Sequence, residues 1–171
     1  FSNFDAILVG GSSLSDNKHI ERIQKIKSLT DKPLILFPGS SNQVNNHVDA
    51  IFYLSLITGR NPKYLIDEHV ASAFSIYDFD LEAIPVGYML IDGSKVSAVE
   101  IESETSPIPS DQIDSIVSHA LAGQYLGHKF IFLEAGSGAK EHIKGKLIKH
   151  LKEYLKIPII VGGGIVNIEI A

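Results

Sequence analysis

Residues 130–139 read FIFLEAGSGA, in which four apolar residues lead into a carboxylate and then into a loop of small residues. A buried strand that ends at Glu134 would hold this carboxylate at the carboxyl end of the strand. Gly136 and Gly138 would let the backbone approach a ligand closely, and successive N–H groups there form a positive concavity suited to phosphate. Glu134 could then take a proton from a hydroxyl group of the same ligand, as a general base.

A second glycine loop, 162–164, follows the apolar run PIIV. Two such loops on neighbouring units favour a bound phosphate over glycines that only close tight turns, although that plainer interpretation stays open. Neither loop has the G-x-G-x-x-G spacing of a dinucleotide site or the lysine and serine of a P-loop, so a small phosphorylated ligand is favoured over a nucleotide. Glu134 could instead be a solvated or lysine-paired strand end. Tyr88, in PVGYMLI, could face the same mouth or belong to the core.

The elements that must position these residues alternate between short apolar runs and amphipathic stretches. The runs are continuously apolar, as strands covered on both faces of a parallel sheet are. We predict strands at 4–9, 33–37, 50–55, 85–91, 130–134 and 158–162. We predict helices over 16–29, 61–77 and 139–156, the second with Ile66, Val70, Ala73 and Tyr77 as its apolar stripe.

Two further features of the chain concern its organisation. The DGSK turn between 85–91 and a second apolar run, 96–101, predicts a local β-hairpin. The β-α units fit two α/β architectures, an open doubly wound sheet or a closed TIM (β/α)8 barrel. A barrel needs about 250 residues and eight strands. Only six strands are predicted here, so the chain forms either an open sheet or an incomplete barrel.

Composition excludes several classes of function. The formal net charge of −5 argues against a general nucleic-acid surface. The chain has no cysteine, so thiolate metal sites are excluded, and its seven histidines form no recognisable metal set. No apolar run reaches the roughly 20 residues of a membrane span, and the start lacks the basic region of a signal peptide. We expect a cytoplasmic protein.

Six motifs, taken together and in order, resemble the geranylgeranylglyceryl phosphate synthase family, which includes the heptaprenylglyceryl phosphate synthases. They are VGGSS (9–13), LFPGS (36–40), SLITGRNPKYLI (55–66), IPVGYMLIDG (84–93), FLEAGSGA (132–139) and PIIVGGGI (158–165). The likeness covers nearly the whole chain and is closest to the second of the family's two groups. It implies a TIM-barrel prenyltransferase that joins sn-glycerol 1-phosphate to a polyprenyl diphosphate, with geranylgeranyl expected, and that requires Mg²⁺.

The resemblance also implies roles for particular residues. The glycerol 1-phosphate site would comprise Phe132, Leu133, Glu134, Ala135, Gly136, Ser137, Gly138, Gly163 and Gly164. Glu134 would take the proton from the attacking hydroxyl, Tyr88 would lie near the reacting centre, and Ser12 would be a Mg²⁺ ligand. Phe132 stands where the family often has Tyr, which removes a hydroxyl contact. The family's Mg²⁺-binding Asp on the first strand and its phosphate contact on the eighth strand have no counterpart, so we expect segments to be missing, with junctions near Leu14 and Ile165. The resemblance thus implies that residues 1–171 form a single (β/α) barrel domain that is incomplete at its N- and C-terminal ends.

Other interpretations stay open at this point. A different glycerol-phosphate barrel enzyme, an isomerase or lyase, would use the same glycine loops, but such enzymes usually carry a lysine at a strand end and none follows a strand here. A non-catalytic phosphometabolite-binding protein would keep the loops and tolerate the loss of Glu134. A homo-oligomer and transient contact with a membrane surface are expected; the prenyl chain length and the size of the oligomer are not given by the sequence.

Overall fold

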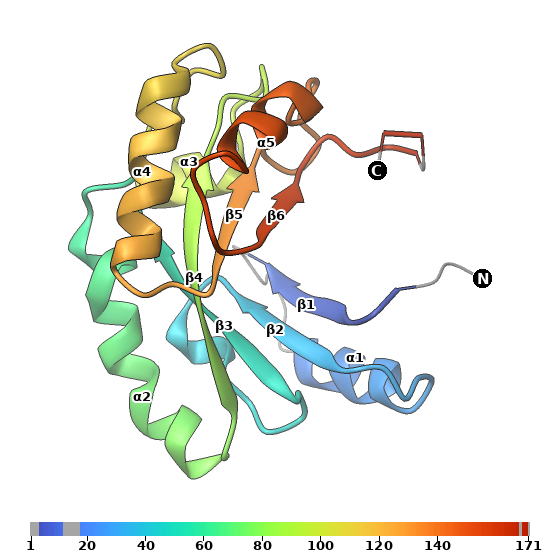
Figure 1. Cartoon of the computed structure of the whole chain (residues 1–171). Helices are drawn as coiled ribbons and strands as arrows, with labels where there is room; N and C mark the ends of the chain where they lie inside the picture. Colours follow the sequence, from blue (N-terminus) through green and yellow to red (C-terminus); the bar gives the residue numbers. More distant parts are fainter. Residues whose placement is uncertain (1–3, 12–17, 168, 171) are drawn as a thin grey trace. The chain divides into compact units, whose positions relative to one another are not determined.

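The structure is a computed structural model that describes residues 4–11, 18–167, 169 and 170 (Figure 1). Its strands are β1 (Ile7–Gly11), β2 (Leu34–Pro38), β3 (Ala50–Leu56), β4 (Glu82–Leu90), β5 (Phe130–Glu134) and β6 (Ile159–Gly162). Their order in the sheet follows their order in the chain, and β1 with β2, β2 with β3, β4 with β5 and β5 with β6 pair in parallel. A doubly wound sheet would reverse this order at a switch point. The sequential order is that of the (β/α) barrel class, which confirms the predicted class.

Helices separate these strands. They are α1 (His19–Lys27), the 3₁₀ turn η1 (Ser41–Gln43), the π-helical η2 (Lys63–Asp67), α2 (Glu68–Asp78), α3 (Ala98–Ser103), α4 (Ile113–Tyr125) and α5 (Gly145–Leu151). No helix among the described residues is long and apolar enough to cross a membrane. Contact density divides the chain into two compact units, and each is described by itself.

The first unit comprises the chain up to Tyr53 together with Ile66–Ile84. Its core is built from β1, β2, the start of β3, α1 and α2. The buried members are Val9, Ile23, Leu34, Leu36, Val48, Ile51 and Ile76. The strands contribute the fully buried residues Leu34 and Leu36, as expected for strands covered on both faces.

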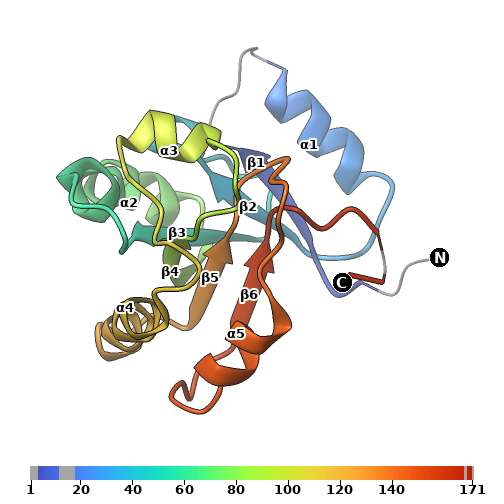
Figure 2. The same cartoon turned by 90° about the horizontal axis from the view of Figure 1, so that it is seen from above.

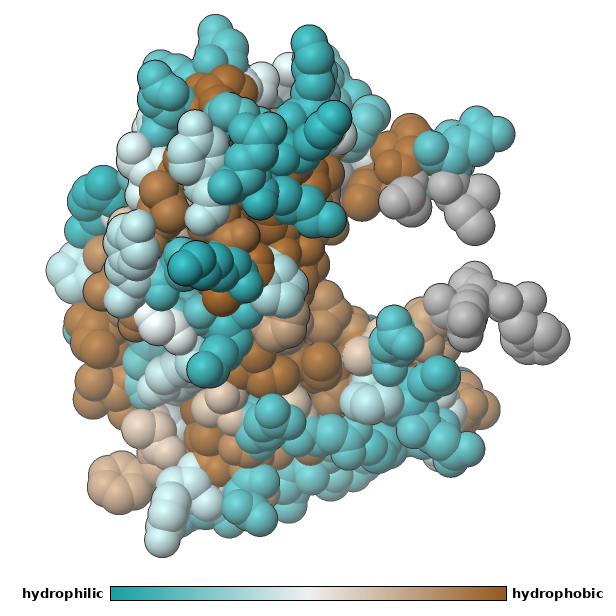
Figure 3. Space-filling view, in the orientation of Figure 1, coloured by the Kyte–Doolittle hydropathy of each residue, from teal (hydrophilic) through white to brown (hydrophobic). Residues whose placement is uncertain are grey.

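The predicted apolar stripe of the second helix is wrong. Val70 and Tyr77 are exposed, and Figure 3 shows hydrophobic surface over the region that α2 occupies in Figure 1. His69, Ser72 and Ile76 are buried instead. The polar pair tolerates burial because the His69 ring packs edge-on against Tyr53 and the Ser72 hydroxyl donates to backbone carbonyls of the preceding turn.

The second unit comprises Leu54–Leu65 and the chain from Pro85 onward. Figure 2 shows α4 and α5 on the same face of β5 and β6. Buried residues of both helices join those of the strands in one cluster, in which Ile116, Ala120, Ile131, Leu133 and Leu151 are fully buried. Helix α4 was not among our predicted helices, although its buried Ile116, Val117 and Ala120 recur at helical spacing.

The predicted β-hairpin after β4 is also wrong. Residues 98–103 form α3, because the Ser97 side chain accepts a hydrogen bond from Glu100 N (3.1 Å) while Ser97 N donates to the Glu100 carboxylate (3.3 Å). This reciprocal capping box starts a helix directly after the turn. The chain therefore continues the β-α alternation at this point.

Candidate active site

Glu134 is the last residue of β5, which confirms its predicted place at the carboxyl end of a strand. In the sheet it lies level with Leu90 of β4 and Gly162 of β6. Its carboxylate oxygen Oε1 accepts a hydrogen bond from Gly136 N at 2.8 Å, and Tyr88 donates a side-chain hydrogen bond to the same carboxylate. The structure thus brings together Glu134, Tyr88 and the first glycine loop.

Burial raises the pKa of the Glu134 carboxyl above its ordinary value. The hydrogen bonds from Gly136 N and Tyr88 favour the charged form and offset part of this rise. No lysine or arginine among the described residues forms an ion pair with Glu134. A carboxylate that is desolvated and lacks a cationic partner is a better proton acceptor near neutral pH than an exposed one.

Tyr88 is buried, and its pKa is raised by burial and by the neighbouring Glu134 charge. Its hydroxyl therefore stays protonated and acts as a hydrogen-bond donor. Its ring lies 5.4 Å from that of Phe132, at an angle of 41°. This aromatic pair forms one wall beside the carboxylate, so Tyr88 belongs both to the core and to the surroundings of Glu134.

The two glycine loops lie against each other. A Cβ atom built on Gly163 would be 2.7 Å from Glu134 Oε1 and also 2.7 Å from both N and O of Gly136. The backbone of Gly163 has φ +81°, which L side chains rarely adopt. Any other residue at this position would displace either the carboxylate or the first loop. Close approach of two backbones explains why glycine is needed here.

Several backbone donors of these loops point to no protein acceptor. In the part of the chain that the structure describes, the N–H groups of Ser137, Gly138, Gly163 and Gly164 have no hydrogen-bond acceptor. Ser137 and Gly138 are exposed to solvent, and Gly163 and Gly164 are half-buried. An oxyanion bound at these two touching loops would supply the missing acceptors.

The helix that we predicted to begin near Ala139 begins at Gly145 instead. Residues between them bind the segment that follows β4, since Lys140 N and Glu141 N both donate to Gly93 O, at 3.0 and 3.2 Å. A helix N-terminus therefore does not contribute to the first glycine loop. The loop is positioned by the segment after β4, and a Cβ on Gly136 would lie 2.8 Å from Ser97 Cβ.

The other predicted site residues fall into two groups. The side chains of Leu133 and Ala135 are buried in the core, so only their backbone could contact a ligand. Phe132 is nearly buried beside Tyr88. Ser12, the predicted metal ligand, lies outside the described residues. Within the described ranges no three His, Asp or Glu side chains come together to hold a metal ion.

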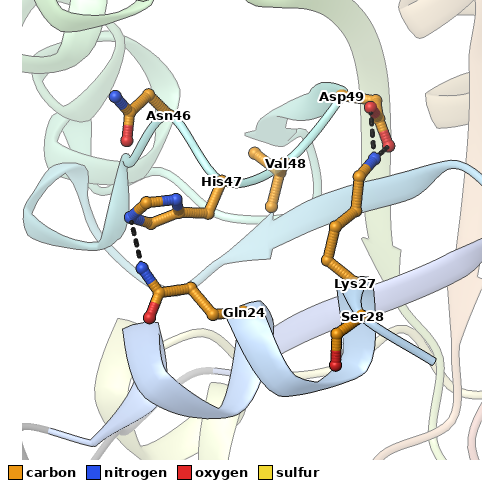
Figure 4. Close-up of a pocket in the computed structure, with 7 residues that line it drawn as sticks. All are labelled: Gln24, Lys27, Ser28, Asn46, His47, Val48 and Asp49. Carbon is orange, nitrogen blue, oxygen red and sulfur yellow. Dashed lines mark hydrogen bonds and ion pairs between the residues drawn. The ribbon is translucent and has the colours of Figure 1, made fainter. Parts of the chain in front are cut away.

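A cavity of about 430 Å³ lies elsewhere, in the first unit (Figure 4). It is lined by Gln24, Lys27, Ser28, Asn46, His47, Val48 and Asp49. These residues end α1 or precede β3, so the cavity lies at the amino ends of the strands. Barrel enzymes place their chemistry at the carboxyl ends, where Glu134 and the glycine loops lie.

Sequence reasoning missed two residues of the segment after β4. Gly93 accepts the two hydrogen bonds that shape the first glycine loop, and a Cβ on Gly138 would lie 3.0 Å from Lys95 Nζ. The DGSK turn was visible in the sequence, but because it was predicted to close a hairpin, it was not considered as part of the site at the carboxyl ends of the strands. Its position directly after a parallel strand was the signal that could have found both residues.

The fold and the site agree with what comparison with known proteins reveals. A model of the PcrB family matches residues 2–171. The chain belongs to the PcrB family. This confirms the family resemblance on which the site residues were predicted.

Members of known activity and structure are similar to this chain. A geranylgeranylglyceryl phosphate synthase of Chitinophaga pinensis is 46% identical over 165 residues, which is 96% of this chain and 66% of the relative. Wild-type GGGPS from Thermoplasma volcanium has a TM-score of 0.89 and 36% identity, over 96% of this chain and 66% of its own. The chain thus spans about two thirds of the length of these relatives.

The structure of (S)-3-O-geranylgeranylglyceryl phosphate synthase from Thermoplasma acidophilum was determined in complex with sn-glycerol-1-phosphate. It has a TM-score of 0.87 and 37% identity, over 94% of this chain and 64% of that chain. This likeness places the parallel strands and their helices in the same barrel class.

Proposed function

We propose that this member of the PcrB family is a prenyltransferase that joins sn-glycerol 1-phosphate to a polyprenyl diphosphate. The observation that carries the proposal is the contact between the two glycine loops beside Glu134. The unsatisfied N–H groups of Ser137, Gly138, Gly163 and Gly164 suit a phosphate group. The names and bound substrate of the relatives give the ligand its chemical identity.

In the proposed reaction a hydroxyl oxygen of glycerol phosphate attacks the first carbon of the prenyl chain. The new carbon–oxygen ether bond forms while the carbon–oxygen bond to diphosphate breaks, and diphosphate leaves with the bonding electrons. The hydroxyl proton passes to the Glu134 carboxylate. Tyr88 keeps this carboxylate oriented through its hydrogen bond, and the raised pKa of Glu134 matches its use as a proton acceptor.

A Mg²⁺ requirement is part of the proposal and rests on the family resemblance. When bound, the ion would neutralise charge on the leaving diphosphate. Ser12 stays its predicted ligand. A homo-oligomer and a cytoplasmic location also stay predictions.

The test is a transfer assay with the full-length protein, labelled geranylgeranyl diphosphate and sn-glycerol 1-phosphate, in the presence of Mg²⁺. The proposal expects an acid-stable ether product and one diphosphate per product. The mirror-image sn-glycerol 3-phosphate serves as the matched control, because it has the same charge and composition. Binding of glycerol 1-phosphate without product, over a range of prenyl chain lengths, would favour a phosphometabolite-binding protein instead.

A further inference from the structure

Lys95 lies in the segment between β4 and α3, at the carboxyl ends of the strands (Figure 1). Its Nζ atom is 3.0 Å from the position that a Cβ on Gly138 would take. The ammonium group therefore lies directly against the first glycine loop. This lysine brings a positive side chain to a loop whose own donors are neutral N–H groups.

The backbone on either side of Lys95 is anchored. On one side, Ser94 N donates to the Asp92 carboxylate at 2.7 Å, and Ser94 adopts φ 60°. On the other side, Ser97 is buried and caps α3. Gly93 accepts backbone hydrogen bonds from Lys140 and Glu141, directly after the first glycine loop. These contacts fix the backbone from which the Lys95 side chain extends toward Gly138.

The charge of Lys95 is not neutralised by a neighbouring carboxylate. Among the described residues, no Asp or Glu lies within ion-pair distance of its ammonium. Glu141, on the same loop, pairs with Lys144 at 3.5 Å. The side chain of Lys95 is exposed to solvent. An exposed and unneutralised cation beside unsatisfied N–H donors is a suitable partner for an anion.

We infer that Lys95 contacts the phosphate group of the acceptor substrate and sets the preference of the site for a dianionic headgroup. The ligand in this inference rests on the proposed function. The unsatisfied amides of the two glycine loops position the phosphate oxygens, and the ammonium adds attraction that depends on the charge of the ligand. It also offsets the repulsion between the phosphate and the Glu134 carboxylate.

The test measures binding of inorganic phosphate and of sn-glycerol 1-phosphate by calorimetry, in the full-length protein and its variants. Lys95→Gln is expected to weaken both affinities roughly five- to tenfold, the range for one partly screened contact with a charged group. The effect should shrink at high salt because the contact is exposed. Lys95→Arg should restore most of the affinity.

Lys129→Gln is the matched control. It makes the same change of charge on an exposed lysine of the same unit, directly before β5, at the opposite end of the strand that carries Glu134. Its affinities should stay within about twofold of the wild type, since Debye screening limits the effect of distant surface charges. If it weakens binding as much as Lys95→Gln, the effect is one of net charge and the inference is wrong.

Kinetics separate this inference from the proposed function. For Lys95→Gln the KM for glycerol 1-phosphate should rise with kcat nearly unchanged, because the phosphate contact is the same in ground state and transition state. Wild-type affinity in Lys95→Gln would overturn the inference and leave the prenyltransferase proposal standing. If the wild type binds phosphate through Lys95 but transfers no prenyl group, the inference stands and the prenyltransferase proposal is wrong.

Discussion

Two carboxylates, Asp49 in the first unit and Glu134 in the second, have similar local hydrogen bonding and opposite pKa shifts. Each accepts a backbone N–H at 2.8 Å, Asp49 from Leu34 and Glu134 from Gly136. The pKa of Asp49 is lowered, chiefly by its hydrogen bond with Lys27, whereas burial raises the pKa of Glu134. The difference arises from the partner and the solvent exposure, not from the backbone contact.

The comparison separates a structural carboxylate from a reactive one. Asp49 precedes β3 at the amino end of the sheet, is exposed, and pairs with a lysine that neutralises it. Glu134 ends β5 beside the two glycine loops, and its side-chain partner is the neutral hydroxyl of Tyr88. A paired and solvated charge has little tendency to take up a proton near pH 7, whereas a desolvated carboxylate does.

The largest effect is expected when each carboxylate is replaced by its amide. Glu134→Gln should lower prenyl transfer at saturating substrate by roughly 10²–10⁴-fold, the loss typical of a general base. Asp49→Asn should leave transfer within about twofold, since it lies at the other end of the strands. Steady-state kcat of the two variants measures the contrast. Equal losses would mean that both substitutions act through the fold.

The next effect concerns the contact between the loops. Gly163→Ala should raise the KM for glycerol 1-phosphate by roughly tenfold or more and also lower kcat. The reason is that the new Cβ crowds both the Gly136 backbone and the Glu134 carboxylate. Gly127→Ala is its control: Gly127 also has positive φ, at +93°, but a Cβ there would meet nothing within 4 Å. Both variants carry backbone strain of about 1–2 kcal/mol, and only Gly163→Ala should impair activity.

A smaller effect is expected from the tyrosine hydroxyl. Tyr88→Phe removes a hydrogen bond that favours the charged form of Glu134, so the pKa of this carboxyl should rise further. The acid limb of the kcat profile should then move to higher pH, with a loss of roughly tenfold or less at neutral pH. Tyr53→Phe, which removes a hydroxyl donating to His69 O at 2.7 Å in the first unit, should not move the profile. A shift toward lower pH in Tyr88→Phe would contradict the assignment.

The smallest effect is on stability. Because the folded-state pKa of Asp49 is lowered, its contribution is present above the unfolded value of about 3.9 and is lost as pH falls through the folded value. Asp49→Asn should cost less than about 1 kcal/mol at pH 7, since the pair with Lys27 is exposed and screened. Urea unfolding at pH 7 and at about pH 2.5 would measure this cost, which should shrink at the lower pH as the carboxyl becomes protonated. A difference that persists in acid would assign it to packing.

Much of the fold follows from local patterns. The apolar runs gave all six described strands to within a few residues, because strands buried on both faces need continuous apolar sequence. The same runs placed Glu134 at a strand end. Errors arose where tertiary contacts decide the outcome. A helix was predicted over residues 139–144, but Lys140 N and Glu141 N donate hydrogen bonds to Gly93 O instead. Helix α2 buries polar residues whose partners the sequence does not reveal.

Part of the site could not be predicted from the sequence either. The contact between Gly163 and Gly136 follows from the pairing of β5 with β6, which apolar runs alone do not specify. The hydrogen bond from Tyr88 to Glu134 requires the neighbouring strands β4 and β5 to lie in the observed register. The position of Lys95 depends on the turn before α3, where a capping box starts a helix in place of the expected hairpin.

The pH dependence of kcat in wild type and Glu134→Gln tests the central claim most directly, because kcat reports the groups that titrate in the substrate complex. The account predicts an acid limb in the wild type with an apparent pKa above the ordinary glutamate value, and its disappearance in Glu134→Gln, whose residual rate keeps only the titration of the substrates. An unchanged acid limb in Glu134→Gln would show that another group takes the proton.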